Sequence, residues 1–281
     1  MKDVAGKVAF ITGGASGLGL AMANSFSAAG MKVAIADIEE SALRAAAESF
    51  SNTNAEVITM QVDVTDRDAM ADARQRTLDA FGKVHVVCNN AGVALNGNIA
   101  DMTYQDWDWV MKVNLDGVIN GIVTFIDDIK SHNEGGHFVN TASIAGQYGI
   151  PTLSVYVASK FAVVGISESM RADLAQDNIG VSVLCPGIVD TGIGSSERNR
   201  PDIFGGSATP SMTAQGSDLP AEMNVMDPSA IGDIVLHAVL HDQFYILTHP
   251  EFAPIVQKRG DEIAASFEYW RAYRAQHEKA T

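Results

Sequence analysis

The sequence is poor in cysteine and in basic residues, and both shortages restrict the class of protein. It contains 2 cysteines among 281 residues, Cys88 and Cys185, each within an apolar run. Two buried thiols provide no disulfide framework, which is usual in a reducing compartment. Lysine and arginine number 19 against 34 aspartates and glutamates, a net charge of −15. This surplus argues against nucleic acid or an anionic membrane as a partner.

Long apolar runs and metal-ligand patterns are also missing. Residues 1–7 lack the apolar core of a signal peptide, and no apolar run approaches the roughly 20 residues that span a bilayer. We therefore expect a soluble, cytoplasmic protein. The 7 histidines are scattered, with no pair at ligand spacing supported by carboxylates, so no metal site is predicted. His237 and His241 are expected on an outward helix face.

Short apolar runs alternate with helical patterns along the chain. Alternation of this kind predicts an α/β fold: one Rossmann-like, doubly wound parallel sheet of about seven strands, with helices on both faces. The expected strands are 7–12, 32–36, 56–61, 83–88, 136–141, 181–185 and 243–248. The expected helices are 20–29, 39–50, 67–81 after a cap at 63–66, 103–130 with a kink near Asn114, 154–178, 228–241 and 252–279.

We expect residues 1–281 to form one dinucleotide-binding catalytic domain with two additions. Residues 192–227 are rich in Gly, Ser, Pro, Asn and Met, and so long a loop is usually a lid or a binding segment. A mobile surface loop is the alternative. The apolar lid candidates are Ile193, Ile203, Phe204, Met212, Met223, Val225 and Met226. Residues 252–279 are predicted to form a charged amphipathic helical extension.

A glycine-rich turn joins the first strand to the first helix. At such a place backbone N–H groups and a helix N-terminus can receive a pyrophosphate, although a tight structural turn is the alternative. The spacing is Thr-Gly-x-x-x-Gly-x-Gly, and the candidate residues are Gly13, Ser16, Gly17, Leu18 and Gly19.

Asp37 ends the second strand and is the candidate for recognising the cofactor. A carboxylate there can accept hydrogen bonds from the adenosine ribose hydroxyls and repels a 2′-phosphate, and no arginine is near in sequence. NAD is therefore favoured over NADP. Capping of the helix at Glu39 is the alternative, and both roles are compatible. Asp63 and Val64 fall where the adenine would lie.

Tyr156 and Lys160 are spaced for one face of a helix. A nearby ammonium is expected to lower the phenol pKa toward neutrality, where Tyr156 would serve as a general base. Ser143 precedes a connection that can bring its hydroxyl beside the phenol. The same pattern also arises by chance in many helices, so the interpretation depends on the other motifs.

Together these motifs resemble the short-chain dehydrogenase/reductase family over about residues 5–191. The resemblance rests on the glycine-rich turn, Asn89-Asn90-Ala91-Gly92, Asn114, Ser143, Tyr156-x-x-x-Lys160 and Pro186-Gly187. It implies that Tyr156 is the general acid/base, that Lys160 lowers its pKa and binds the nicotinamide ribose, and that Ser143 holds the substrate oxygen. Asn114 would hold a relay water. The remaining cofactor contacts implied are Asn90, Ala91 and Gly92, and Pro186, Gly187, Ile188, Val189 and Thr191. Dimers or tetramers through helices 103–130 and 154–178 are also implied.

A finer resemblance concerns three segments, 106–109, 113–121 and 245–251. They are similar to a bacterial branch that includes the Cα-dehydrogenases, which oxidise the benzylic alcohol of lignin-derived β-aryl ethers with NAD. The substrate is expected to be a neutral or hydrophobic alcohol or ketone, with Gln147 and Tyr148 near it. Two hypotheses follow: an NAD-dependent alcohol dehydrogenase or ketoreductase, and a catalytically inactive NAD-binding sensor or scaffold.

Overall fold

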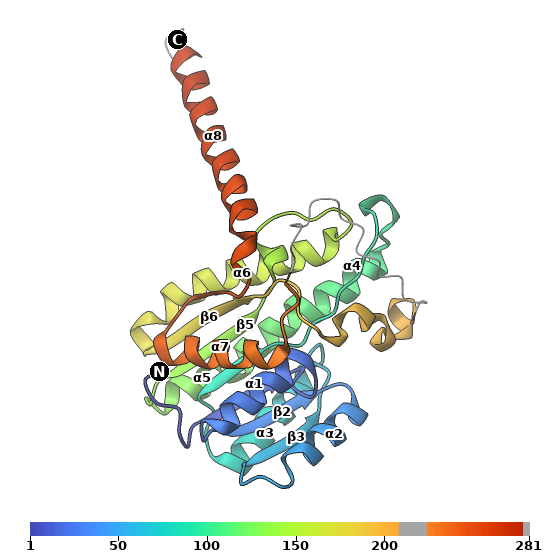
Figure 1. The fold of residues 1–281 in the computed structure, drawn as a ribbon, viewed down its shortest axis with the longest axis vertical. Helices are drawn as coiled ribbons and strands as arrows, with labels where there is room; N and C mark the ends of the chain where they lie inside the picture. Colours follow the sequence, from blue (N-terminus) through green and yellow to red (C-terminus); the bar gives the residue numbers. More distant parts are fainter. Residues whose placement is uncertain (208–223, 278–281) are drawn as a thin grey trace.

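Seven parallel strands form one sheet at the centre of the computed structural model, which describes residues 1–207 and 224–277 (Figure 1). The strand order is β3-β2-β1-β4-β5-β6-β7. The strands are β1 (Val8–Thr12), β2 (Lys32–Asp37), β3 (Val57–Gln61), β4 (Val86–Asn89), β5 (Gly136–Thr141), β6 (Ile179–Cys185) and β7 (Tyr245–Leu247). All seven predicted strands are confirmed, with shifted ends.

Helices cover both faces of the sheet, as predicted. One face packs against α1 (Gly17–Ala28), α2 (Glu40–Phe50) and α7 (Pro228–His241). The other packs against α3 (Arg67–Phe81), α5 (Gly117–Ser131) and α6 (Ser154–Leu174). Strands buried on two faces favour apolar side chains at successive positions, which explains the nearly continuous apolar runs of β1 and β4.

The predicted kink near Asn114 is a π-helical segment. Helix α4 (Tyr104–Met111) continues into Lys112–Asp116 in π conformation and then into α5. A π-turn adds one residue to the helical ladder, and such turns are frequent at functional sites. The segment places Asn114 fully inside the protein.

The same stretch bears on the expectation that no apolar run spans a bilayer. Among the described residues, Tyr104–Ser131 is long and apolar enough, by length and composition, to cross a membrane. Within the most apolar 18-residue part of this stretch, 44% is buried inside the protein. Polar residues interrupt this stretch, among them the buried Asn114 and Asn120, so the sequence shows no continuous apolar run there.

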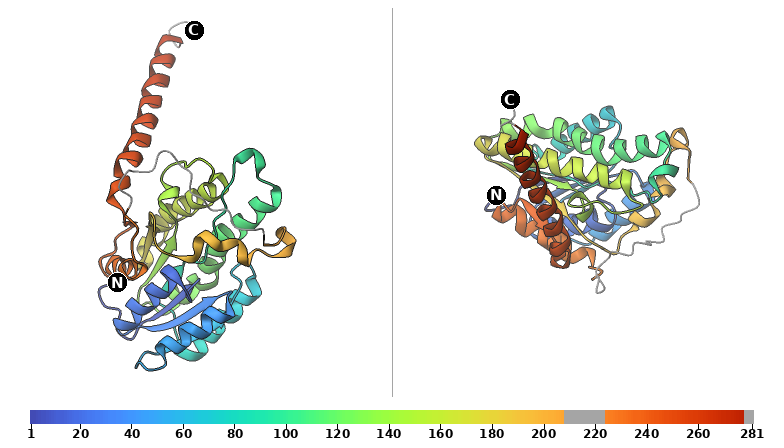
Figure 2. Two further views of the ribbon diagram at one scale, coloured as in Figure 1. Left: turned by 45° about the vertical axis from the view of Figure 1, so that its right-hand side comes forward. Right: turned by 90° about the horizontal axis from the view of Figure 1, so that it is seen from above.

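The segment that follows β6 contains short turns of helix, η5 (Gly192–Asn199) and η6 (Asp202–Phe204). Of the predicted lid residues, Met212 and Met223 lie outside the described part of the chain. Helix α8 (Ala253–His277) confirms the predicted C-terminal helix and projects away from the sheet and its covering helices (Figures 1 and 2).

Candidate active site

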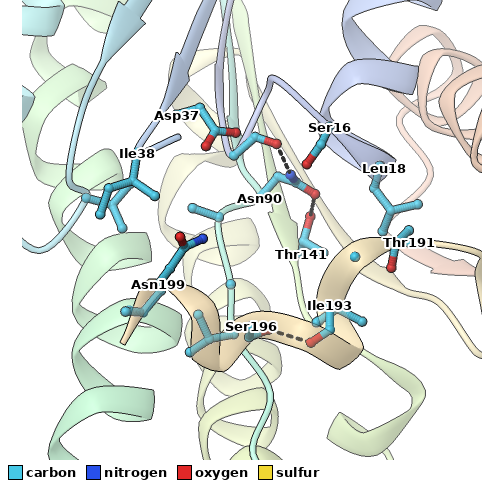
Figure 3. A pocket seen from close by; sticks show the side chains of 18 of the residues that line it. Ser16, Leu18, Asp37, Ile38, Asn90, Thr141, Thr191, Ile193, Ser196 and Asn199 are labelled. Carbon is cyan, nitrogen blue, oxygen red and sulfur yellow. Dashed lines mark hydrogen bonds between the residues drawn. The ribbon is translucent and has the colours of Figure 1, made fainter. Parts of the chain in front are cut away.

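A pocket lies at the carboxyl ends of the strands, where β1 and β4 lead away to opposite sides of the sheet (Figure 3). Ligands of doubly wound sheets bind at such a switch point because the loops there diverge. Of the predicted site residues, those that line it are Gly13, Ser16, Gly17, Leu18, Asp37, Asp63, Val64, Asn90, Ala91, Gly92, Ser143, Tyr156, Lys160, Pro186, Gly187, Val189 and Thr191.

The glycine-rich turn is shaped by contacts that exclude side chains. Gly13 has φ +58°, and a Cβ there would lie 2.9 Å from the Ala91 Cα. A Cβ on Gly19 would lie 2.0 Å from the Gly13 carbonyl oxygen, so Gly19 supports the turn from behind the pocket. Ser16 precedes α1 without capping it through its side chain. The turn therefore presents the backbone N–H groups at the start of α1 to the pocket, as a pyrophosphate requires.

Asn90 braces this turn against the sheet. Its Nδ2 donates to the carbonyls of Thr12 at 3.1 Å and Gly13 at 3.2 Å, and its Oδ1 accepts from the Thr141 hydroxyl at 3.3 Å (Figure 3). Next to it, Asn89 donates to Asn140 at 2.9 Å within the buried sheet. Asn89 and Asn90 therefore tie the glycine-rich turn to the central strands.

Asp37 is 8% exposed and faces the pocket from the end of β2. Its carboxylate accepts from the backbone N–H of Ala15 and of Glu39, both at 3.0 Å. Helix α2 begins at Glu40 with Glu39 as its N-cap, so Asp37 is not the cap itself. Each carboxylate oxygen has further lone pairs, which remain available for ribose hydroxyls. Asp63 similarly accepts from Thr65 N at 2.9 Å and leaves the capping of α3 to Asp66.

The tertiary structure brings an arginine to the adenosine end, which the sequence did not predict. Arg198 of η5 lines the pocket and pairs with Glu39, and Asn199 Nδ2 donates to the same carboxylate at 2.8 Å. Arg198 also donates to the Gly192 carbonyl at 3.0 Å. The guanidinium is thus engaged with a carboxylate and backbone rather than directed to a phosphate, and it lowers the pKa of Glu39.

Ser143, Tyr156 and Lys160 meet at the other end of the pocket. The Ser143 hydroxyl lies near the Tyr156 phenol and acts to lower its pKa. Lys160 Nζ lies 5.4 Å from the centre of the Tyr156 ring and donates to the Thr141 carbonyl at 2.9 Å. Tyr156 and Lys160 come from successive turns of α6, and Ser143 comes from the loop that follows β5. The predicted cluster is therefore assembled.

The expected lowering of the phenol pKa is wrong for the protein alone. Burial raises the pKa of Tyr156, and the hydrogen bond from Ser143 opposes this only in part. Burial also lowers the pKa of Lys160 to about 8. Desolvation penalises both charged forms, phenolate and ammonium, and it outweighs their mutual attraction in a pocket walled by protein.

Asn114 lies behind this cluster and does not line the pocket. Its side chain accepts from Val93 N at 2.8 Å and donates to the Val93 carbonyl at 2.9 Å and to Ser159 at 3.0 Å. If Gly92 carried a Cβ, that atom would lie 3.3 Å from Asn114 Oδ1 and 3.5 Å from Lys160 Nζ. The side chain thus fixes the wall beside Lys160, and its role in a water relay stays a prediction.

The turn after β6 is held by residues that the sequence did not single out for the site. His249, 4% exposed, accepts from Gly187 N at 3.0 Å and donates through Nε2 to the Ile188 carbonyl at 3.0 Å. The Ile188 side chain itself is not among the pocket-lining groups. A Cβ on Gly187 would lie 2.8 Å from the Phe252 ring. His249 and Phe252 therefore fix the position of Pro186 to Val189.

Gln147 does not line the pocket. Its Nε2 donates to the buried Cys185 Sγ at 3.4 Å, and its assignment to the substrate stays a prediction. Tyr148 stacks on Phe252, with ring centres 6.4 Å apart. Both side chains pack behind the Ser143 loop, which supports its position.

An apolar wall beside Tyr156 was missed by the sequence analysis. Val93, Trp109 and Val113 line the pocket, and Trp109 is otherwise buried. The paired tryptophans of segment 106–109 were noted only for their resemblance. Of the predicted lid residues, Ile193 reaches the pocket, Phe204 packs near Trp109, and Met226 pairs with Val189. Ile203 and Val225 are exposed on the surface.

The histidines are less scattered than expected. His85, His132 and Glu134 place their ligand atoms within 4.8 Å of one another, away from the pocket. His132 donates to the Val84 carbonyl at 2.9 Å and accepts from Glu134 N, while His85 accepts from Val8 N and bonds Glu134. Every ring nitrogen is engaged with protein, so the cluster supports no metal site. His237 and His241 are exposed, as predicted, and their rings are stacked.

Comparison with known proteins agrees with this geometry. The family model described as short chain dehydrogenase matches residues 7–202. The chain is 35% identical to a CLA biosynthesis dehydrogenase/reductase of Lactiplantibacillus plantarum, over 94% of this chain and 95% of that one. It is 33% identical to a Cα-dehydrogenase of Sphingobium sp., over 95% and 88%. A short chain dehydrogenase/reductase of Burkholderia phymatum, solved in complex with NAD, superposes with a TM-score of 0.87 at 35% identity, covering 95% of this chain and 97% of that chain.

Proposed function

The chain belongs to the short-chain dehydrogenase/reductase family, and on that premise we propose that it is an NAD-dependent oxidoreductase interconverting a secondary alcohol and a ketone. The observation that carries the proposal is one pocket holding Asp37 at one end and the Ser143–Tyr156–Lys160 cluster at the other. The Asp37 end would recognise the cofactor, and the cluster at the other end would transfer a proton to or from the substrate. We propose in addition that residues 1–281 act as one catalytic domain, because Asp37 of β2 and Thr141 of β5 line the pocket together with residues of the loops that follow β1, β3, β4 and β6.

The residues present fit a dinucleotide. The turn of Gly13 to Gly19 admits close approach of a pyrophosphate, and the Asp37 carboxylate suits ribose hydroxyls rather than a phosphate. Lys160 Nζ would bind the nicotinamide ribose, and the Gly187 turn held by His249 would meet the carboxamide. When bound, nicotinamide exchanges a hydride with the carbinol carbon. The relative solved with NAD supports this assignment.

Tyr156 moves the proton and Ser143 orients the substrate oxygen. Because burial raises its pKa, the phenol is protonated near neutral pH and is ready to donate to a ketone oxygen. In the oxidative direction Tyr156 takes the hydroxyl proton, and the Lys160 ammonium, protonated below about pH 8, stabilises the resulting phenolate. Ser143 donates a second hydrogen bond to the same oxygen.

A hydrophobic alcohol, including an aromatic benzylic one, suits the substrate side. Val93, Trp109 and Val113 provide apolar lining in the pocket that holds Tyr156, and Ile193 of η5 adds to it. Apolar walls favour a neutral substrate because a buried charge would lack a partner. The Cα-dehydrogenase relative supports the benzylic class.

The proposal is tested by replacing Tyr156 with Phe. The loss of one hydroxyl should leave NAD binding within about twofold of the native value and reduce oxidation of a benzylic alcohol by about 100-fold or more. NAD binding is followed by calorimetry and turnover by absorbance of the reduced nicotinamide. Tyr104→Phe is the matched control, because Tyr104 is 90% exposed. Turnover that survives Tyr156→Phe would contradict the mechanism.

A panel of secondary alcohols, with NAD and NADP in parallel, distinguishes the candidate functions. Turnover of benzylic aryl-ether alcohols with NAD supports the finer assignment. Activity confined to cyclic alcohols keeps the oxidoreductase and removes the benzylic class. NAD binding without turnover of any member favours the inactive sensor instead.

A further inference from the structure

Three donor atoms of η5 converge on the carboxylate of Glu39 at the adenosine end of the pocket. Arg198 Nη2 pairs with Oε1, Arg198 Nε lies 3.4 Å from Oε2, and Asn199 Nδ2 donates to Oε1 at 2.8 Å. Glu39, Arg198 and Asn199 line the pocket together with Asp37 and Ile38, and Figure 3 shows Asn199 on the side of Asp37 and Ile38. The donors of η5 thus form an anion site, and the chain's own Glu39 carboxylate fills it.

The Arg198 guanidinium is held by η5 independently of Glu39. Its Nη1 donates to the carbonyls of Gly192 at 3.0 Å and Ser195 at 2.9 Å, and to the Ser195 hydroxyl at 2.9 Å. These bonds stay within η5, so replacement of Glu39 should leave the guanidinium anchored there. Nε and Nη2, which face Glu39, are the parallel donors with which arginine binds the paired oxygens of a carboxylate or a phosphate.

Glu39 links this anion site to the carboxylate proposed for the adenosine ribose. The Asp37 carboxylate accepts from Glu39 N at 3.0 Å, so the ribose site and the anion site share one residue. Among the pocket-lining residues that the structure describes, Asp37, Glu39 and Asp63 are the carboxylates, and Arg198 is the one cation besides Lys160 at the catalytic end. A 2′-phosphate on the adenosine ribose would therefore have Arg198 as its cationic partner in this part of the pocket.

We propose, on the basis of the function proposed above, that Arg198 and Asn199 form a 2′-phosphate site that the Glu39 carboxylate keeps filled, so that Glu39 acts with Asp37 to exclude NADP. In the native chain a 2′-phosphate is repelled by Asp37 and must also displace Glu39 from Arg198, and both obstacles discriminate against it. Arg198 lowers the pKa of Glu39, so the carboxylate stays ionised and the site stays filled at neutral pH. If the ion pair only fastened η5 to α2, its loss would weaken NAD and NADP alike.

The site is tested by titration calorimetry of the full chain with NAD and with NADP. Relative to Asp37→Asn, the double variant Asp37→Asn, Glu39→Ala should bind NADP about 10-fold more tightly or better, because the Arg198 donors become free for the phosphate. The Kd for NAD should change by no more than about fivefold. Glu39 precedes α2 without capping it through its side chain, so its replacement removes no helix cap.

Two further variants separate the phosphate site from a general loss of negative charge. Asp37→Asn with Glu40→Ala removes the same charge one residue further on, where Glu40 pairs with Arg44 on the surface, and should leave the Kd for NADP within about twofold of Asp37→Asn. Arg198→Gln, added to the Asp37→Asn, Glu39→Ala variant, should return the Kd for NADP to that of Asp37→Asn. A gain that persists without Arg198, an equal gain in the Glu40 control, or no gain on removal of Glu39 would each overturn the proposal.

Adenosine fragments give a readout that needs neither the nicotinamide nor turnover. Loss of Glu39 should tighten binding of adenosine 2′,5′-bisphosphate by the same factor as binding of NADP, and binding of AMP should change little. The gain should shrink at high salt, because the ion pair that it replaces is partly exposed. NAD binding without turnover in the native protein would contradict the proposed function and leave this site standing. NAD binding with no gain for the bisphosphate would contradict this site alone.

Discussion

Asp37 serves two purposes with one carboxylate. It holds the backbone of the glycine-rich turn through Ala15 N and the start of the α2 region through Glu39 N. The same group faces the pocket where adenosine ribose hydroxyls would lie. Positioning by two N–H groups keeps the carboxylate oriented before any ligand arrives, which reduces the entropic cost of binding.

Replacing Asp37 with Asn should therefore weaken NAD more than NADP. Loss of a charge-assisted hydrogen bond costs about 1.5–3 kcal/mol, which corresponds to about a 10- to 150-fold rise in the KM for NAD. NADP should bind better than before, because the carboxylate no longer repels its 2′-phosphate. Steady-state kinetics with both cofactors measure the ratio, and Asp68→Asn, on an exposed turn of α3, is the control. Unchanged ratios would remove Asp37 from the site.

At the scale of elements, η5 crosses the cofactor pocket and is fastened to α2. Arg198 and Asn199 both reach Glu39, while Ser196 accepts from Ala94 N at 3.2 Å at the substrate side. The described part of the predicted lid is thus attached at both ends of the pocket. A dinucleotide lying between these attachments would be enclosed by them, so their strength should influence cofactor release.

Glu39→Gln should loosen this enclosure. The ion pair is partly exposed, with Arg198 41% accessible, so it contributes only about 0.2–1 kcal/mol. We expect the Kd for NAD to rise about 2- to 5-fold, with a faster dissociation rate and little change in kcat. The difference should shrink at high salt, which screens exposed charges. Glu40→Gln, whose carboxylate pairs with Arg44 on the surface, is the control. A larger kcat effect than Kd effect would place Glu39 in the chemistry instead.

At the scale of the whole molecule, the sheet contains a buried histidine whose charged form is strongly disfavoured. His137 of β5 is fully buried, and Nε2 contacts the Ser182 hydroxyl at 2.7 Å. Ser182 donates to the Gln243 carbonyl, so it accepts from Nε2, and Nδ1 has no partner among the described residues. Burial lowers the pKa of His137 to about 3 from an ordinary value of 6.5. The folded protein therefore keeps this ring neutral across most of the acidic range.

Acid should destabilise the fold through His137. Between about pH 6.5 and 3 the unfolded chain binds a proton that the folded chain refuses, so stability is present above pH 6.5 and falls as the pH falls. The slope is at most about 1.4 kcal/mol per pH unit. His137→Gln should remove this part of the slope in urea unfolding between pH 5 and 6.5, whereas the exposed His237→Gln should not. If the slope is the same in His137→Gln as in the native protein, the folded protein protonates His137 without losing stability, and the prediction is wrong.

The sequence by itself determined the sheet, its helices and most of the pocket. Continuous apolar runs such as Val8–Thr12 specify strands buried on both faces, and glycines such as Gly13 mark turns that no other residue fits. Both signals are local in the chain. The Ser143, Tyr156 and Lys160 cluster was also predictable, because strand ends and helix faces of this fold meet at one edge.

Only the tertiary structure decided what these residues touch. Arg198 reaches Glu39 across 159 positions, and His249 reaches Gly187 across 62, separations that no local pattern encodes. The pKa of Tyr156 rose where a neighbouring ammonium predicted a fall, since burial depends on the complete wall of the pocket. The apolar side chains of α8, such as Phe267 and Trp270, were visible in the sequence, but only the structure shows that they are exposed. Local propensity fixes elements, whereas desolvation and long-range contacts depend on how the elements are placed together.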